Sequence, residues 1–122
     1  MNLKILLVDD EEEFITTLSE RLELRGYSTD TASDGQQALA MLDATCYDVV
    51  MLDLMMPGMS GLEILQQAKR LKPDLPIILL TGHGSTREGI EGMRLGAVDF
   101  LMKPLDIVEL ITKIEEAVRI RE

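Results

Sequence analysis

Five polar side chains stand directly after short apolar runs of this sequence, at Asp9, Asp10, Asp53, Thr81 and Lys103. Clustered carboxylates repel one another unless a cation lies between them, and Mg²⁺ is a hard cation that prefers oxygen ligands. The lysine offers a fixed positive charge for an anionic group, and the threonine offers a hydroxyl donor. An aspartate can itself attack phosphorus, and such a transfer needs mainly positioning and charge neutralisation. These residue types together favour Mg²⁺-assisted phosphoryl chemistry, with Asp53 as the candidate acceptor.

Each residue also has a purely structural interpretation. Asp9 or Asp10 could cap a following helix, and Asp53 could begin the turn that contains Pro57 and Gly58. A threonine has high strand propensity, and a lysine at a strand end could simply be solvated. The functional interpretation therefore depends on whether all five side chains meet at one edge of one sheet.

The elements that must position these residues alternate regularly between strand and helix. Apolar or β-branched runs predict five strands, at Leu3–Val8, Tyr27–Thr31, Asp48–Leu52, Pro76–Leu80 and Val98–Met102. Helical spacing follows each of them, with Ser33 or Asp34, Ser60 and Asp106 as expected caps. This alternation predicts an α/β fold, a flavodoxin-like doubly wound five-stranded parallel sheet in the order 2-1-3-4-5 with five helices. In that order strands 1, 3, 4 and 5 are neighbours, so their polar ends should share one crevice.

Composition limits the classes of function. The 122 residues suit one domain, and no linker-like stretch divides residues 1–122. A net charge of −10 argues against direct nucleic-acid binding by this domain. The single cysteine, Cys46, permits no internal disulfide and indicates a reducing compartment, so we expect a cytoplasmic protein. No apolar run is long enough for a signal peptide or a membrane span, so no membrane association is expected.

Four stretches closely resemble the receiver domains of bacterial two-component response regulators, which share the chemotaxis-type receiver fold. They are ILLVDDE, VVMLDLMMPGMSG, IILLTGHG and GAVDFLMKP, in the order and at the spacing typical of that family. The resemblance covers essentially the whole chain. The local sequences TGHGS and AVDFLMKPLD are similar to receivers of the nitrogen-control or nitrogen-fixation type.

The resemblance implies a role for each matching position. Asp53 is implied as the phosphoacceptor, with Asp10 as a direct Mg²⁺ ligand, Asp9 acting mostly through water, and the backbone carbonyl of Met55 as a further ligand. Lys103 would pair with the carboxylate and then with the phosphoryl group. Thr81 would bind a phosphoryl oxygen and shift on phosphorylation, and Phe100 would be the aromatic switch behind it. The Lys103–Pro104 bond is commonly cis in this family.

The implied function is a phosphorylation-dependent signalling switch. A sensor histidine kinase would phosphorylate Asp53, and the fourth helix, fifth strand and last helix would signal to an output domain or a downstream protein. The domain would catalyse only its own phosphorylation and dephosphorylation, so it would not be an enzyme in the usual sense. A phosphorelay intermediate that passes the group to a histidine phosphotransfer protein is the alternative, and a phosphorylation-dependent homodimer stays open.

Two other classes fit the residues less well. Phosphatases of the haloacid dehalogenase type also use a nucleophilic strand-end aspartate, but they need a second aspartate where this chain has Met55. A flavin-binding electron carrier needs a phosphate loop rich in serine, threonine and glycine after the first strand. This chain has DDEEE there, which repels phosphate.

Two further features leave alternatives open. Met55 and His83 lie two residues after Asp53 and Thr81, at positions that resemble tuners of phosphoryl lifetime, although His83 could be a solvated loop residue. Gly89 and Gly92 interrupt the predicted fourth helix at Thr86–Leu95. Each glycine destabilises a helix by about 1 kcal/mol relative to alanine. They indicate either a weakened switching element, which alanine at both positions would stiffen, or close packing against a neighbour.

Overall fold

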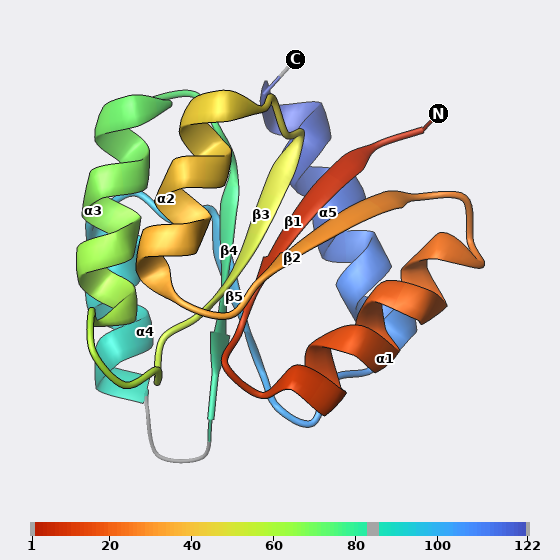
Figure 1. Ribbon diagram of the computed structural model, residues 1–122, viewed down its shortest axis with the longest axis horizontal. Helices are drawn as coiled ribbons and strands as arrows, with labels where there is room; N and C mark the ends of the chain where they lie inside the picture. The colour runs from red at the N-terminus through yellow and green to blue at the C-terminus, as the bar shows by residue number, and fades with distance from the viewer. Residues whose placement is uncertain (1, 83–85, 122) are drawn as a thin grey trace.

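The computed structural model describes residues 2–82 and 86–121, and its elements alternate between strand and helix throughout (Figure 1). The strands and helices are β1 (Lys4–Val8), α1 (Glu12–Glu23), β2 (Ser28–Ala32), α2 (Gly35–Ala44), β3 (Val49–Asp53), α3 (Gly61–Leu71), β4 (Ile77–Thr81), α4 (Thr86–Arg94), β5 (Asp99–Met102) and α5 (Ile107–Arg121). The predicted α/β class is confirmed.

All strand pairs in the sheet are parallel, and the strand order is β2-β1-β3-β4-β5. This confirms the predicted order 2-1-3-4-5. Strands β3 and β4 are buried along their whole length, which matches their continuous apolar sequences. Strand β2, with the sequence STDTA, is half-exposed because it forms an edge of the sheet.

Helices cover both faces of the sheet. Helices α1 and α5 lie on one face, and α2, α3 and α4 lie on the other (Figure 1). Two separate apolar clusters follow from this arrangement, because alternate strand residues face opposite sides. Thus Ile5, Leu7 and Met51 pack towards α1 and α5, whereas Leu6, Val50 and Leu52 pack towards α2 and α3.

Three helices begin at caps that the sequence predicts. Asp34 accepts a hydrogen bond from the Gln37 N–H, Ser60 from the Glu63 N–H, and Asp106 from the Val108 N–H. The observed strand bounds shift by about one residue from the predicted ones, so that Asp53 and Thr81 are the last residues of their strands. Both side chains are therefore held by the sheet rather than by a loop.

The two glycines inside α4 differ in their surroundings. A Cβ atom on Gly92 would collide with the side chain of Leu79, which is fully buried in β4. A Cβ on Gly89 would only reach ordinary contact distance, 3.6 Å from atoms of both Phe100 and Thr81. Gly92 therefore permits close packing of α4 on the sheet, which supports close packing as the explanation for this glycine. His83, the other open question of the sequence, lies outside the described residues.

Candidate functional site

The carboxyl ends of β1 and β3 bring three carboxylates together. Asp9 follows β1, Asp53 ends β3, and both are buried, whereas Asp10 is exposed. One carboxylate oxygen from each of the three lies within 4.8 Å of the others. The meeting of Asp9, Asp10 and Asp53 that the sequence predicted is therefore observed.

Asp53 lies in an environment that disfavours its charge. Burial raises the pKa of Asp53 to about 6, and the nearby Asp9 charge adds to this effect. The Met55 N–H, which donates to Asp53 Oδ1 at 3.1 Å, and the Lys103 ammonium act in the opposite direction on that pKa. The carboxylate is thus under-compensated, which leaves it ready to gain from an added positive charge.

Lys103 follows β5 and brings that charge into the site, yet its nearest partners are two other acids. Its Nζ lies 2.8 Å from Asp9 Oδ2 and 2.7 Å from Glu11 Oε1, but 3.8 Å from Asp53 Oδ2. Burial alone would lower the pKa of Lys103, but the hydrogen bonds with Asp9 and Glu11 outweigh burial and raise it. Lys103 is therefore a firmly charged group, shared among three carboxylates.

Two residues of this site were not assigned to it from the sequence. Glu11 pairs with Lys103, and the Phe14 ring lies beneath the same ammonium, with 4.5 Å between Nζ and the ring centroid. Helical side chains lean towards the N-terminus of their helix, so a phenylalanine in the first turn of α1 could have been expected to reach this end.

Thr81 and Phe100 lie beside the acidic cluster, on β4 and β5. The Thr81 side chain is buried, and its Oγ1 lies 3.4 Å from the carbonyl oxygen of Leu101 as a long hydrogen bond. Phe100 is half-buried, and the position above Gly89 is flanked by both the Phe100 ring and the Thr81 methyl group. The hydroxyl thus contacts β5 here, and α4 lies directly over both side chains.

The remaining predicted site residues follow β3 and β5. Met55 is 60% exposed, and its backbone N–H donates to Asp53 Oδ1. The Lys103–Pro104 peptide bond is cis.

The donor set of this cluster fits a hard divalent cation. It offers three carboxylates on one side and open solvent on the side of Asp10. Asp9 Oδ2 is buried, and the Lys103 ammonium 2.8 Å from it is shared with Glu11 and Asp53. A single shared lysine leaves negative charge on the three clustered carboxylates uncompensated, so the residues present suit Mg²⁺.

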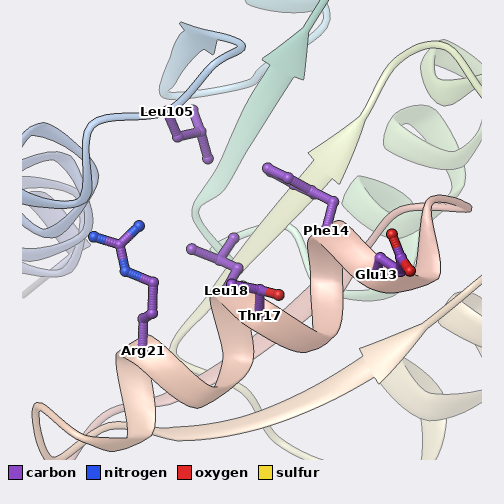
Figure 2. A pocket seen from close by; sticks show the side chains of 6 residues that line it. All are labelled: Glu13, Phe14, Thr17, Leu18, Arg21 and Leu105. Atoms are coloured by element: carbon purple, nitrogen blue, oxygen red, sulfur yellow. The ribbon is translucent and has the colours of Figure 1, made fainter.

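A groove of about 340 Å³ opens next to this site, between α1 and the segment that joins β5 to α5. Figure 2 shows its lining side chains, which are Glu13, Phe14, Thr17, Leu18, Arg21 and Leu105. Phe14 belongs to both places, since its ring also contacts Lys103. The groove therefore provides a partly apolar surface beside the carboxylates.

No helix within residues 2–82 and 86–121 combines the length and the apolar character needed to cross a bilayer.

Comparisons with known proteins agree with this geometry. The chain is 38% identical over 119 residues to the alkaline phosphatase synthesis transcriptional regulatory protein PhoP of Bacillus subtilis, covering 98% of this chain and 50% of that protein. The chain spans about half the length of the curated relatives it matches.

Solved structures show the same fold. A response regulator receiver domain protein from Clostridium thermocellum superposes with a TM-score of 0.94 at 35% identity, covering 98% of this chain and 96% of that one. The receiver domain of NtrX from Brucella abortus gives a TM-score of 0.90 at 34% identity, covering 94% and 98%. The family model described as "Response regulator receiver domain" matches residues 5–115. With its parallel sheet in the order 2-1-3-4-5 and its acidic cluster at the strand ends, this chain belongs to the response regulator receiver domains of two-component systems.

Proposed function

We propose that residues 1–122 form one receiver domain that accepts a phosphoryl group on Asp53 from a sensor histidine kinase. Receiver domains are signalling proteins rather than classical enzymes. The observation that carries the proposal is a buried, under-compensated carboxylate at a strand end, with Asp9 and Asp10 beside it and the Lys103 ammonium 3.8 Å away.

In the proposed transfer, a carboxylate oxygen of Asp53 forms a bond to phosphorus while the bond from phosphorus to the donor nitrogen breaks. The electron pair of that bond leaves with the donor imidazole. Negative charge on the phosphoryl oxygens must be balanced as they arrive, and the Lys103 ammonium and the Thr81 hydroxyl are the groups of this chain that can do so. Thr81 must then turn from the Leu101 carbonyl towards the phosphoryl group.

Asp9, Asp10 and Asp53, with the backbone carbonyl of Met55, would hold Mg²⁺ in this site. When bound, the ion supplies positive charge that neutralises the acidic cluster and the phosphoryl oxygens. Asp9 and Asp53 are fixed by the sheet, whereas exposed Asp10 completes the site from the solvent side.

The groove beside the site gives the phosphodonor protein a place to dock. A donor histidine must reach Asp53, so its domain must rest on the surface around the pocket, and Phe14 links the groove to Lys103. Thr17→Arg, which places a long cation in this groove, should slow transfer from a kinase that phosphorylates the chain. Transfer from a small-molecule donor should be unchanged, and equal slowing of both would contradict docking at this surface.

The signal would leave through α4, β5 and α5. The rotation of Thr81 removes its contact with β5 and frees space that Phe100 can fill, and both lie under α4 at Gly89. The outer surface of these elements exposes Ile90, Met93, Met102 and Val108, which suits contact with an output domain or another protein. The transcriptional regulators among the relatives favour an output in transcription.

The direct test is the intact mass of the protein after incubation with Mg²⁺ and a small-molecule phosphodonor. We expect one added phosphoryl group in the wild-type protein, and none without Mg²⁺ or in Asp53→Asn. Beryllofluoride serves as a stable mimic of the phosphoryl group. A wild-type protein that forms no adduct and binds no beryllofluoride would contradict the proposal.

The metal site has its own test. Mg²⁺ should raise the melting temperature of the wild-type protein, because a ligand of the native state stabilises it. Asp10→Asn should remove much of this increase. A melting temperature that is indifferent to Mg²⁺ would contradict the metal site without affecting the choice of Asp53.

A further inference from the structure

The Lys103 ammonium is closest to two acids that do not accept the phosphoryl group. Its distances to Glu11 and Asp9 are 2.7 and 2.8 Å, about 1 Å shorter than its 3.8 Å distance to Asp53. The ammonium donates a hydrogen bond to Glu11 and lies at hydrogen-bond distance from Asp9, whereas Asp53 Oδ2 is beyond that distance, so the two short contacts hold the ammonium. In the unphosphorylated state Lys103 is therefore held partly away from the acceptor.

Glu11 and Asp9 differ in what happens to them when the site is loaded. Asp9 is one of the three carboxylates suited to Mg²⁺, so a bound ion would compete with Lys103 for it. Glu11 is not part of that cluster, and its side chain is 64% exposed. With the metal present, Glu11 remains as the acid that competes with a phosphoryl group for Lys103.

The backbone keeps Glu11 within reach of Lys103. The Glu11 N–H donates to Asp9 Oδ1 at 2.9 Å, which ties the residue before α1 to the acidic cluster. The Lys103 ammonium lies over the Phe14 ring, and the Lys103 side chain is only 18% exposed. A short movement of the ammonium, without any backbone change, is enough to exchange Glu11 for a group on Asp53.

We propose that Glu11 is a positioning residue that restrains Lys103 in the unphosphorylated domain and so lowers its affinity for a phosphoryl group on Asp53. This inference rests on the proposed function. Glu11 thereby sets part of the balance between the unphosphorylated and phosphorylated forms. An ion pair with one exposed partner has a modest effect, so removing it should strengthen binding of a phosphoryl mimic about two- to fivefold.

The test is the dissociation constant of beryllofluoride at saturating Mg²⁺, which excludes changes in metal affinity. We expect Glu11→Gln to bind about two- to fivefold more tightly than the wild-type protein. Glu12→Gln is the matched control, because it removes the same charge one residue later and Glu12 has no ion pair among the described residues. Its dissociation constant should stay near the wild-type value.

Two further variants show whether Glu11 acts through Lys103. In a Lys103→Met background, which keeps the apolar stem, Glu11→Gln should change binding no more than Glu12→Gln does. Glu11→Asp keeps the charge but shortens the reach, so its affinity should lie between those of the wild-type protein and Glu11→Gln.

A metal-free measurement provides an independent readout. Nitrogen-15 NMR measures how fast the side-chain ammonium of Lys103 exchanges its protons with water. We expect this exchange to be faster in Glu11→Gln than in the wild-type protein. If the wild-type protein binds beryllofluoride but Glu11→Gln matches Glu12→Gln in affinity, the inference is wrong and the proposed function stands. If the wild-type protein binds no beryllofluoride at all, the proposed function fails, and the inference fails with it.

Discussion

Helices α3 and α4 lie next to each other on the same face of the sheet (Figure 1), but they are attached to it differently. Helix α3 begins with the Ser60 cap and buries Ile64, Leu65 and Ala68. Helix α4 has glycines at its buried positions 89 and 92 and leaves Ile90 and Met93 on the surface. Large apolar side chains anchor α3, whereas α4 meets the sheet largely through backbone.

This difference matches the roles proposed for the two regions. Helix α3 follows the loop after Asp53, so a rigid α3 keeps the acceptor in place. Helix α4 lies over Thr81 and Phe100, the pair proposed to move, and fewer anchoring side chains lower the free energy needed to shift it. The proposed chemistry thus lies on well-packed elements, and the proposed signalling lies on a less anchored one.

The largest expected effect comes from the start of α3. A Cβ on Gly61 would lie 2.5 Å from the Leu54 Cα and 2.9 Å from the Asp53 carbonyl oxygen. Both are backbone atoms that cannot turn away, so Gly61→Ala should lower the free energy of unfolding by about 2–3 kcal/mol. Urea denaturation measures this change. A loss below about 1 kcal/mol would show that the start of α3 does not pack tightly against the backbone of Asp53 and Leu54.

Gly92→Ala, within α4, should lower the free energy of unfolding by less than Gly61→Ala does. The new methyl group would meet the Leu79 side chain, which is flexible but fully buried. The net loss in unfolding free energy should be about 1–2 kcal/mol, because better helix propensity offsets part of the overpacking. Adding Leu79→Val should restore part of the loss, and absence of any restoration would argue against this contact as the cause.

Ionisation of Asp53 should lower the free energy of unfolding of the metal-free protein, by less than either of these glycine substitutions does. The pKa of Asp53 rises from 3.8 to about 6 on folding, so the folded state binds this proton more tightly. The stability contributed by the protonated group is complete below about pH 4 and is lost as pH rises through about 6.

Asp53→Asn should therefore be more stable than the wild-type protein at pH 8 by on the order of 1 kcal/mol, allowing for screening by solvent. This difference should shrink towards zero near pH 4. Urea denaturation at both pH values in the presence of a chelator checks it, and a difference that is constant with pH would contradict the raised pKa.

Gly89→Ala should have the smallest effect on stability and should act on signalling instead. Its methyl group would touch Phe100 and Thr81 at about the ordinary contact distance of 3.6 Å. We expect a gain of about 0.5–1 kcal/mol from helix propensity, with a smaller response of α4 to beryllofluoride. Amide hydrogen exchange of α4 with and without beryllofluoride measures that response, and an unchanged response would mean that Gly89 does not set the mobility of α4.

Much of the fold was predictable because the relevant signals are local. Apolar or β-branched runs predicted the five strands, and the caps Asp34, Ser60 and Asp106 marked helix starts. The site could be located because strand ends at one edge of a parallel sheet must meet. Choosing Asp53 as the acceptor depended on the family resemblance, since spacing alone does not distinguish it from Asp9 or Asp10.

The features that could not be decided from the sequence are contacts between distant parts of the chain. The ion pair of Glu11 with Lys103 joins residues 92 positions apart, and the close approach of Gly92 to Leu79 depends on how α4 sits on β4. Neither contact leaves a local pattern, because an acidic run and a glycine pair each have several structural explanations. Side-chain packing had to be known before these could be assigned.

The most direct test is amide hydrogen exchange of the protein phosphorylated on Asp53, compared with the unphosphorylated protein, helix by helix. We expect exchange to change in α4 and β5 and to stay the same in α3. Equal changes in both helices, or none in either while intact mass shows the phosphoryl group, would contradict a switch that moves α4 against a fixed α3.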